Sequence, residues 1–338
     1  MRLSTKLALK VPQIRRLWTH RSNLVAEVAD LRTRLAIPTS AEIPANGDSP
    51  FYHYHCDVDA QDLIRRYALV DQPSTPGMLT NFLGVKIPPA DFAGILDGRE
   101  GEVEGVPIPA NWHADIAEWA AALRAVDAAT GTFRIIELGC GWGCWLNNMG
   151  AAARSRGLAL DLIGIEGDEG HVASARRILA ANGFAESDYR VVHGIAAPKP
   201  GKALFPVVAN PGATWGSAPR FDASEAEIAE ATASGGYALL NAMTLDELTK
   251  GQPVDLLHVD IQGGETAFLA DNFDDIKRLV KRILIGTHSR SIEGDIMRMM
   301  LDAGWRLEME RPAILGIADS VPHVVVDGVQ AYGNPRIG

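Results

Sequence analysis

An apolar strand that ends in three glycines at alternate positions is the feature that most restricts the fold of this chain. The residues Ile135-Ile136-Glu137-Leu138 run directly into Gly139, Gly141 and Gly143. Because glycine has no Cβ, such a turn can adopt positive φ and bring bare backbone against a ligand. The pattern therefore predicts a strand-to-helix turn that holds a cofactor.

The next predicted strand supplies a polar group for the same cofactor. The apolar run Leu160–Ile165 leads into Glu166, Gly167 and Asp168. A carboxylate at such a strand end can accept hydrogen bonds from both hydroxyls of a ribose, so we assign Glu166 as the ribose ligand. The full predicted cofactor-binding set is Glu137, Gly139, Cys140, Gly141, Gly143, Glu166, Gly167, His193 and Asp260.

Two cofactor classes compete for this turn. The dinucleotide fingerprint requires a third glycine three residues after the second, and that position holds Cys144. The Glu-x-Gly-x-Gly-x-Gly run of residues 137–143 resembles motif I of class I S-adenosylmethionine methyltransferases, in which the turn faces the methionine part of the cofactor. A NAD-dependent or nucleotide-sugar oxidoreductase stays as the alternative, as does a tight turn without any ligand.

Length, net charge and cysteine content exclude several classes of protein. With 338 residues, 47% of them hydrophobic, the chain can build one large domain and an appendage. The net charge of -10 argues against nucleic acid as a partner, because a polyanion requires a basic surface. The three cysteines suit reduced thiols better than a disulfide or a zinc site, and neither a long apolar run nor a signal peptide is evident. We therefore expect a cytoplasmic protein.

The first 37 residues carry two signals of their own. Basic and apolar residues interleave up to about residue 23 without an acid, as in segments that lie on an anionic membrane or are simply solvated. Two seven-residue series then indicate a short coiled coil, or a helix that packs on the body of the protein. The sequence thus predicts contact with a membrane or a glycan-synthesis assembly, and a homodimer. The apolar members of the series are Ile14, Leu17, Leu24, Val28, Leu31 and Leu35.

Residues 38–111 separate this segment from the predicted catalytic domain. Pro, Ser, Asn and Gly in residues 38–50 indicate a linker, and the Pro- and Gly-rich stretch that follows predicts a lid or capping region. A long helix is expected from about Trp112 to Ala128.

From residue 112 to the C-terminus, strands and helices alternate regularly. This pattern predicts an α/β fold, a Rossmann-like, seven-stranded, mostly parallel sheet with helices on both faces. Residues 198–240 exceed a normal crossover and predict a substrate loop over the pocket. The expected strands are 134–138, 160–165, 190–195, 255–260, 282–287, 306–310 and 322–327, and three of the expected helices are 170–182, 265–272 and 292–303.

Two polar residues follow neighbouring predicted strands, where an open α/β sheet binds its ligand. Asp260 closes one strand and His288 follows the next. An alcohol becomes a good nucleophile for a sulfonium methyl group only when its proton has an acceptor. We assign His288 as the general base and Asp260 as the residue that orients it. The alternative is a histidine that only hydrogen-bonds a loop.

The same residues form a candidate metal site. Asp260, Glu265 and His288 can converge on one Mg²⁺ or Ca²⁺, because Gly263 and Gly264 allow a tight turn between the two carboxylates. Glu265 has a second interpretation as an acid in the first turn of a helix, where the helix dipole favours it.

Four residues are assigned to the substrate. Trp215 lies in a glycine-rich insertion, where it can stack on a sugar ring or pack as a loop aromatic. His113 and Asp115 follow the proline-rich region, and either contact the substrate or only start a helix. Tyr54, in an aromatic and histidine-rich stretch, completes this set.

Two further motifs resemble a known family. Thr244–Leu248 reads Thr-Leu-Asp-Glu-Leu, and residues 255–265 read Asp-Leu-Leu-His-Val-Asp-Ile-Gln-Gly-Gly-Glu. Both are similar, in order and spacing, to motifs of FkbM-type methyltransferases, and the similarity covers roughly residues 130–310. It implies a S-adenosylmethionine-dependent O-methyltransferase that acts on a sugar, glycan or glycosylated small molecule. Gln262 replaces the usual acid, which removes a charge from the site. An inactive methyltransferase-like scaffold is the remaining alternative.

Overall fold

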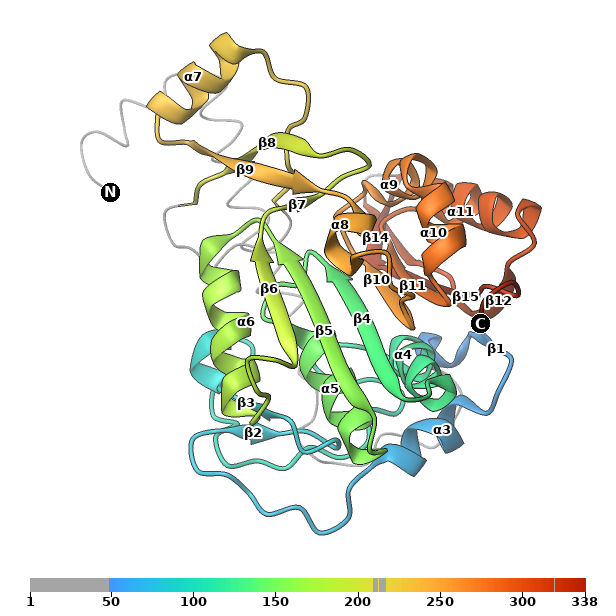
Figure 1. Ribbon diagram of the computed structural model, residues 1–338. Helices are drawn as coiled ribbons and strands as arrows, with labels where there is room; N and C mark the ends of the chain where they lie inside the picture. Colours follow the sequence, from blue (N-terminus) through green and yellow to red (C-terminus); the bar gives the residue numbers. More distant parts are fainter. Residues whose placement is uncertain (1–48, 209–211, 213–216, 319) are drawn as a thin grey trace. The chain divides into compact units, whose positions relative to one another are not determined.

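The computed structural model describes residues 49–208, 212, 217–318 and 320–338, and a mixed sheet forms its centre (Figure 1). The sheet has eight strands in the order β1-β12-β15-β11-β10-β4-β5-β6. Neighbouring strands from β11 to β6 are parallel, and β15 runs antiparallel to both β11 and β12. The sheet confirms the predicted fold class. Its strands are β1 His55–Cys56, β4 Thr132–Leu138, β5 Ala159–Glu166, β6 Tyr189–His193, β10 Leu256–Val259, β11 Arg282–Thr287, β12 Arg306–Arg311 and β15 Gly328–Gly333.

The central strands are apolar because both faces of the sheet are covered. Alternate residues of β4 enter two separate cores, with Ile135 in one and Ile136 in the other. Glu137 pairs in register with His258 of β10 and with Gly164 of β5. The polar residues Glu137 and His258 of neighbouring strands therefore lie side by side near the carboxyl end of the sheet.

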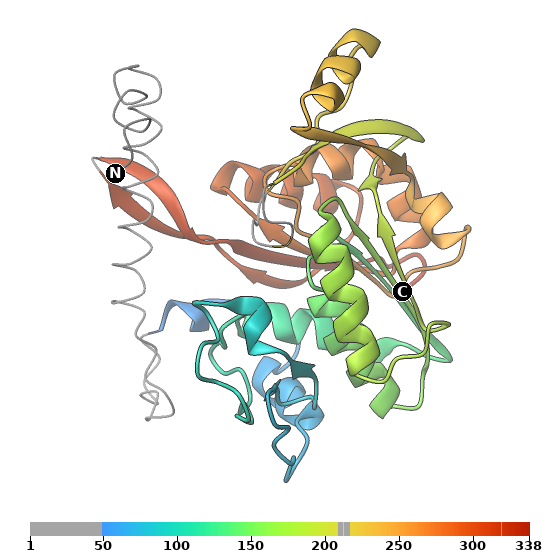
Figure 2. The same cartoon turned by 90° about the vertical axis from the view of Figure 1, so that its left-hand side faces the viewer.

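Helices cover the two faces in two groups, seen on opposite sides of the sheet in Figure 2. The first core is closed by α3 Ala60–Tyr67, α4 Ile116–Ala128, α5 Cys144–Ser155 and α6 Glu169–Ala181. The second core is closed by α8 Leu245–Thr249, α9 Glu265–Asp271, α10 Phe273–Leu279 and α11 Arg290–Asp302. The helices predicted at 170–182, 265–272 and 292–303 are thus present within two residues at each end.

The prediction of a seventh sheet strand at 322–327 is wrong. Residues Val321–Val326 form β14, which pairs only with β13 Ile314–Ala318 in a separate hairpin, and β15 takes the place in the sheet. The apolar run suggested burial, but Val325 within it is 48% exposed. Every residue of β15 is buried, because β11 and β12 flank it.

Helix α4 begins at Ile116 rather than near Trp112. Asp115 caps it by accepting a hydrogen bond from Ala117 N at 2.7 Å, and the Glu118 carboxylate accepts one from Asp115 N at 3.0 Å. The side chain of Asn111 accepts hydrogen bonds from the two residues before this cap. Such a reciprocal capping box fixes the start of a helix more strongly than apolar spacing does.

The segment before α4 packs on the helices of the first core. Phe82 makes an edge-to-face contact with Trp119 of α4, with ring centroids 5.0 Å apart. The elements of this segment besides β1 and α3 are η1 Pro50–Tyr52, β2 Leu79–Thr80, β3 Lys86–Ile87 and η2 Pro89–Phe92. The coiled coil and basic stretch expected in residues 1–37 lie outside the described residues, so the contacts predicted from them stay predictions. Within the described part, no helix combines the length and apolar character that crossing a membrane requires.

Residues 198–240 are more regular than the loop predicted for them. Strands β8 Gly201–Pro206 and β9 Tyr237–Met243 form a three-stranded sheet with β7 Ile195–Ala196. Helix α7 Glu225–Ala233 connects β8 to β9, and Figure 1 shows this unit beyond the carboxyl ends of β5 and β6.

Candidate active site

The glycine turn after β4 has the conformation that its sequence predicts. Gly139, Gly141 and Gly143 all have positive φ, of 65°, 51° and 74°. A Cβ on Gly139 would lie 2.8 Å from the backbone oxygen of Asp260, a separation that only glycine avoids. The first glycine thus lets the ends of β4 and β10 approach each other.

Glu166 closes the turn from the neighbouring strand. Its carboxylate accepts hydrogen bonds from Gly141 N at 2.9 Å and from Asp168 N at 2.8 Å, through different oxygens. Each oxygen keeps a lone pair for a ligand, since a carboxylate offers about four acceptor positions. The Glu166 side chain is 8% exposed and lines the central cavity, so its assignment to a ribose stays a prediction with free acceptor positions to serve it.

Glu137 holds the start of helix α5 as well as bordering the cavity. Its two oxygens accept hydrogen bonds from Trp145 N at 3.2 Å and Leu146 N at 3.0 Å, in the first turn of α5. Burial raises the pKa of Glu137 to about 8, against the lowering effect of these two bonds. The side chain also borders the cavity, but its primary partners are the unpaired amides of a helix N-terminus.

A cavity of about 980 Å³ lies at the carboxyl edge of the sheet. The glycine turn, Glu166 and Asp260 all line it, as do residues 198–202, 217–219, 221 and 222 of the predicted substrate loop. Of the described residues, none before His113 lines it. The region expected to act as a lid instead contacts α4 and α6, so its described part does not cover this cavity.

Several predicted site residues are placed away from the cavity. Asp115 is 3% exposed and bonds Arg311, with 2.6 Å between Oδ2 and Nε. Tyr54 packs against the first core, and Trp215 lies outside the described residues. His193 does not line the cavity, and its Nε2 forms a hydrogen bond with the backbone oxygen of Gly167 at 3.0 Å. His113 and Cys140 do line the cavity.

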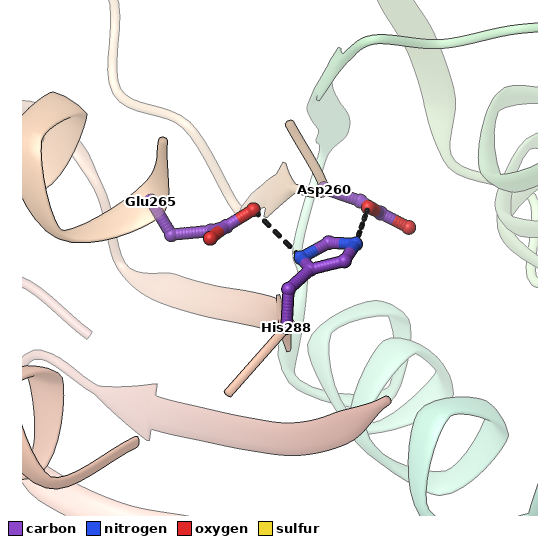
Figure 3. Close-up of side chains that lie close together, drawn as sticks. All are labelled: Asp260, Glu265 and His288. Carbon is purple, nitrogen blue, oxygen red and sulfur yellow. Dashed lines mark ion pairs between the residues drawn. The ribbon is translucent and has the colours of Figure 1, made fainter. Parts of the chain in front are cut away.

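Asp260, Glu265 and His288 come together as predicted (Figure 3). His288 Nδ1 lies 3.0 Å from Glu265 Oε1, and Nε2 lies 3.4 Å from Asp260 Oδ1 and 3.8 Å from Asp327 Oδ2. Neither imidazole nitrogen has the alignment of a hydrogen bond, so these are charge contacts. Gly286 leaves room for the Asp260 side chain, because a Cβ at position 286 would lie 3.4 Å from the Asp260 carboxyl carbon.

The motif around Asp260 folds back on itself. The Glu265 carboxylate accepts hydrogen bonds from Ile261 N at 3.2 Å and Gly263 N at 3.0 Å, which closes the loop at the start of α9. Gln262 adopts a positive φ of 58° in this loop. Glu265 therefore fulfils both of its predicted descriptions, as a helix-start acid and as a member of the cluster.

The electrostatics of the cluster favour a charged imidazole. Desolvation lowers the pKa of His288, but Glu265, Asp260 and Asp327 outweigh it and raise this pKa to about 9. Burial raises the pKa of Asp260 to about 6, although His288 opposes the change. Asp260 lines the cavity with 42% of its side chain accessible, whereas His288 does not line it. An imidazole that is protonated at neutral pH does not suit the general-base role that the sequence predicted.

Three further residues line the cavity and were missed or misread from sequence. Glu118 belongs to the capping box of α4 and also lines the cavity. Its Asp-x-x-Glu spacing can be recognised in the sequence, but that spacing predicts only the start of a helix. His258 sits within a buried strand, and Trp142 within the glycine turn. Nothing in their local sequence distinguishes them from core residues.

Comparison with known proteins places the chain in a family. No family model matches. A "Putative methyltransferase" of Jannaschia sp. (strain CCS1) is 50% identical over 274 residues, which span 81% of this chain and 98% of that protein. The chain belongs to this methyltransferase family.

Solved structures provide more distant likenesses. The methyltransferase FkbM from Methylobacillus flagellatus KT is 11% identical, with a TM-score of 0.40 over 64% of this chain and 54% of that one. The match thus spans about half of the FkbM chain. A human methyltransferase 10 domain containing protein is also 11% identical, with a TM-score of 0.35 over 63% and 77%. At such TM-scores these likenesses do not bear on what this chain acts on.

Proposed function

We propose that the chain is a S-adenosylmethionine-dependent O-methyltransferase of the FkbM type, with a hydroxyl of a sugar, glycan or glycosylated small molecule as its acceptor. The main observation in favour of this proposal is that a single cavity is lined by the glycine turn, the Glu166 carboxylate and Asp260. Bare backbone and a ribose-binding acid suit the cofactor, and a carboxylate at the neighbouring strand end suits the acceptor.

The reaction is an in-line displacement at carbon. The acceptor oxygen attacks the sulfonium methyl group, the carbon–sulfur bond breaks, and its electron pair stays on sulfur. The hydroxyl proton must leave as the new carbon–oxygen bond forms. Asp260 is the member of the acidic cluster that reaches the cavity, so we assign proton acceptance to Asp260 and the positioning of Asp260 to His288.

Cofactor titration tests the first half of this proposal. We expect S-adenosylmethionine to bind the full chain in calorimetry and NAD not to bind. Glu166→Gln should weaken S-adenosylmethionine binding by about 10–100-fold, because a hydrogen bond to a charged group contributes about 1.5–3 kcal/mol. Glu169→Gln is the matched control, since this neighbouring acid is exposed. Binding of NAD alone would instead support the oxidoreductase.

A divalent metal site is a second candidate role for the acidic cluster. One ligand atom each from Asp260, Glu265 and His288 lie within 4.8 Å of one another. Glu265 Oε2 is buried and has no hydrogen-bond partner in the described part of the chain, which is costly unless something binds it. These residues would hold Mg²⁺ or Ca²⁺, and the ion would supply a positive charge that stabilises an acceptor oxygen as it loses its proton.

Metal removal distinguishes the two roles of the cluster. If the cluster holds a metal, EDTA should abolish turnover and Mg²⁺ or Ca²⁺ should restore it, and Glu265→Gln should raise the concentration needed for half-restoration at least tenfold. Asp274→Asn, an exposed acid of α10, is the control. Full turnover after EDTA treatment and desalting would rule out a required metal.

A further inference from the structure

One end of the cavity is built almost entirely from hydrogen-bond acceptors. Glu118 projects into it from the first turn of α4, opposite Asp260 at the end of β10. Glu118 Oε2 accepts a bond from Asp115 N, and its other oxygen has no hydrogen bond to the described residues. Burial is the main cause that raises the pKa of Glu118 and of Glu137, and the charge of Asp260 adds to both shifts, so Asp260 lies near each of them.

Two neutral imidazoles complete this end. His258 is 6% exposed, lines the cavity, and has no hydrogen-bond partner for Nδ1 among the described residues. His113 lines the cavity as well, and desolvation lowers its pKa to about 4 and that of His258 to about 3. A buried polar atom without a partner is costly, so an unpaired nitrogen on a residue that lines the cavity favours a ligand that supplies the missing hydrogen bond.

Aromatic rings surround these groups. The Trp145 ring centroid lies 5.5 Å from that of His258, and the Trp142 ring centroid lies 5.6 Å from that of His113. Both tryptophans line the cavity. Aromatic faces next to carboxylates are favourable surroundings for an organic cation.

Among the described residues that line this end of the cavity, no lysine or arginine pairs with the acids, and the positive partner of Asp260 is His288, which lies outside the lining. The described lining residues include seven carboxylates and only two lysines, Lys199 and Lys202. Both lysines lie in the segment from β7 to β8, and Lys202 Nζ donates to Asn241 Oδ1 at 2.6 Å. Arg311 lies behind α4, paired with Asp115.

Building on the function proposed above, we propose that the acceptor carries a protonated amino group and that Glu118 binds it, with Asp260 and the two imidazoles as further hydrogen-bond acceptors. A primary ammonium group has three N–H donors and a positive charge, which suit the carboxyl groups of Glu118 and Asp260 together with an imidazole nitrogen. An amino sugar or an amine-bearing glycoside therefore fits, whereas the phosphate or carboxylate of an acidic sugar has no N–H donors to offer these acceptors. The amine stays protonated and a neighbouring hydroxyl receives the methyl group.

Burial gives Glu118 a reason to prefer such a ligand. Desolvation and the charge of Asp115 raise its pKa to about 8, so without a ligand it is largely protonated at neutral pH. A bound ammonium group stabilises the ionised carboxylate instead. A neutral sugar offers no such gain.

The test uses the full chain saturated with S-adenosylhomocysteine, which removes turnover from the measurement. Titration of S-adenosylhomocysteine alone comes first, and failure of this step would sink the proposed function itself. Pairs of methyl glycosides that differ only in an ammonium group against a hydroxyl then serve as probes: gluco, galacto and manno 2-amino sugars and the 3-amino gluco sugar, with their N-acetyl forms.

We expect at least one amino sugar to bind tenfold or more tightly than both its hydroxyl and its N-acetyl counterpart. Glu118→Gln should remove that preference while leaving α4 intact, because glutamine also serves at this capping-box position. The matched control is Glu247→Gln, the same change at the same capping position of the exposed α8 start, which should keep the preference.

Three results would overturn the amine proposal while leaving the methyltransferase proposal standing. The first is the absence of any amino preference in the wild-type chain. The second is a preference that survives Glu118→Gln. The third is a Glu118→Gln variant that binds S-adenosylhomocysteine tenfold more weakly, which would assign Glu118 to the ammonium group of the cofactor.

Discussion

Replacing Arg311 with methionine is expected to lower the free energy of unfolding by about 3–5 kcal/mol, the usual cost of leaving one partner of a buried ion pair alone. Arg311 and Asp115 have side chains only 2% and 3% exposed, and Arg311 Nε lies 2.6 Å from Asp115 Oδ2. The guanidinium also donates to the backbone oxygens of Pro312 and Asp327. Methionine fills much of the same volume but leaves a carboxylate and two carbonyl groups without these donors.

Urea denaturation followed by circular dichroism measures this effect. Arg306→Met on the same strand is the control, since Arg306 is exposed and should change stability by no more than about 0.5 kcal/mol. The double variant Asp115→Asn/Arg311→Met should lose less than the sum of the two single variants, because each removes the same interaction. A loss below about 1 kcal/mol in Arg311→Met would show that the pair does not hold α4 in place.

The ion pair also bears on function, because Asp115 starts the helix that carries Glu118 to the cavity. His113 lies two residues before this cap and lines the same end. Loss of Arg311 should therefore weaken the binding of an amine as well as the fold. The predicted substrate contact of Asp115 is replaced by this indirect role.

The sequence was sufficient to predict those parts of the site that depend only on nearby residues or on adjacent strands. Strand β4 and the glycine turn follow from an apolar run and from the need for positive φ at Gly139, Gly141 and Gly143. The meeting of Asp260 with His288 follows from parallel strands that end at one edge. Each of these inferences required only neighbours in sequence or adjacent strands.

Long-range partners determined what sequence could not predict. Asp115 and Arg311 are 196 positions apart, and no pattern near either residue indicates the other. Part of the negative charge near the His288 imidazole comes from Asp327, which lies just before β15. The misplaced seventh strand has a similar cause, because an apolar run is the same in a buried strand and in an exposed hairpin.

The second large expected effect concerns Asp260, the residue of the acidic cluster to which we assign proton acceptance. Asp260→Asn should lower the turnover number by about 10²–10⁴-fold at saturating S-adenosylmethionine, the usual contribution of a general base. Asparagine keeps the shape of the side chain but cannot take the proton. Transfer of a labelled methyl group to an acceptor identified by binding provides the measurement. Near-wild-type turnover would remove Asp260 from proton transfer, and an unchanged biological role would favour the scaffold alternative.

His288→Gln should affect the pH dependence rather than abolish turnover. The positive imidazole lowers the pKa of Asp260, opposing burial and the acids Asp327 and Glu265, which together leave it at about 6. Glutamine removes that charge, so the pKa of Asp260 should rise. Because the ionised form of Asp260 is the active one, the rise of the rate with pH should move to higher pH.

The two assignments of the base therefore predict different curves. If Asp260 is the base, turnover of His288→Gln recovers to within about tenfold of wild type once the pH exceeds the new pKa. If His288 is the base, the rate stays about 10²–10⁴-fold lower at every pH, since no group replaces the imidazole. His323→Gln controls for the loss of a histidine elsewhere, because His323 lies on the exposed hairpin strand β14 and should leave the profile unchanged.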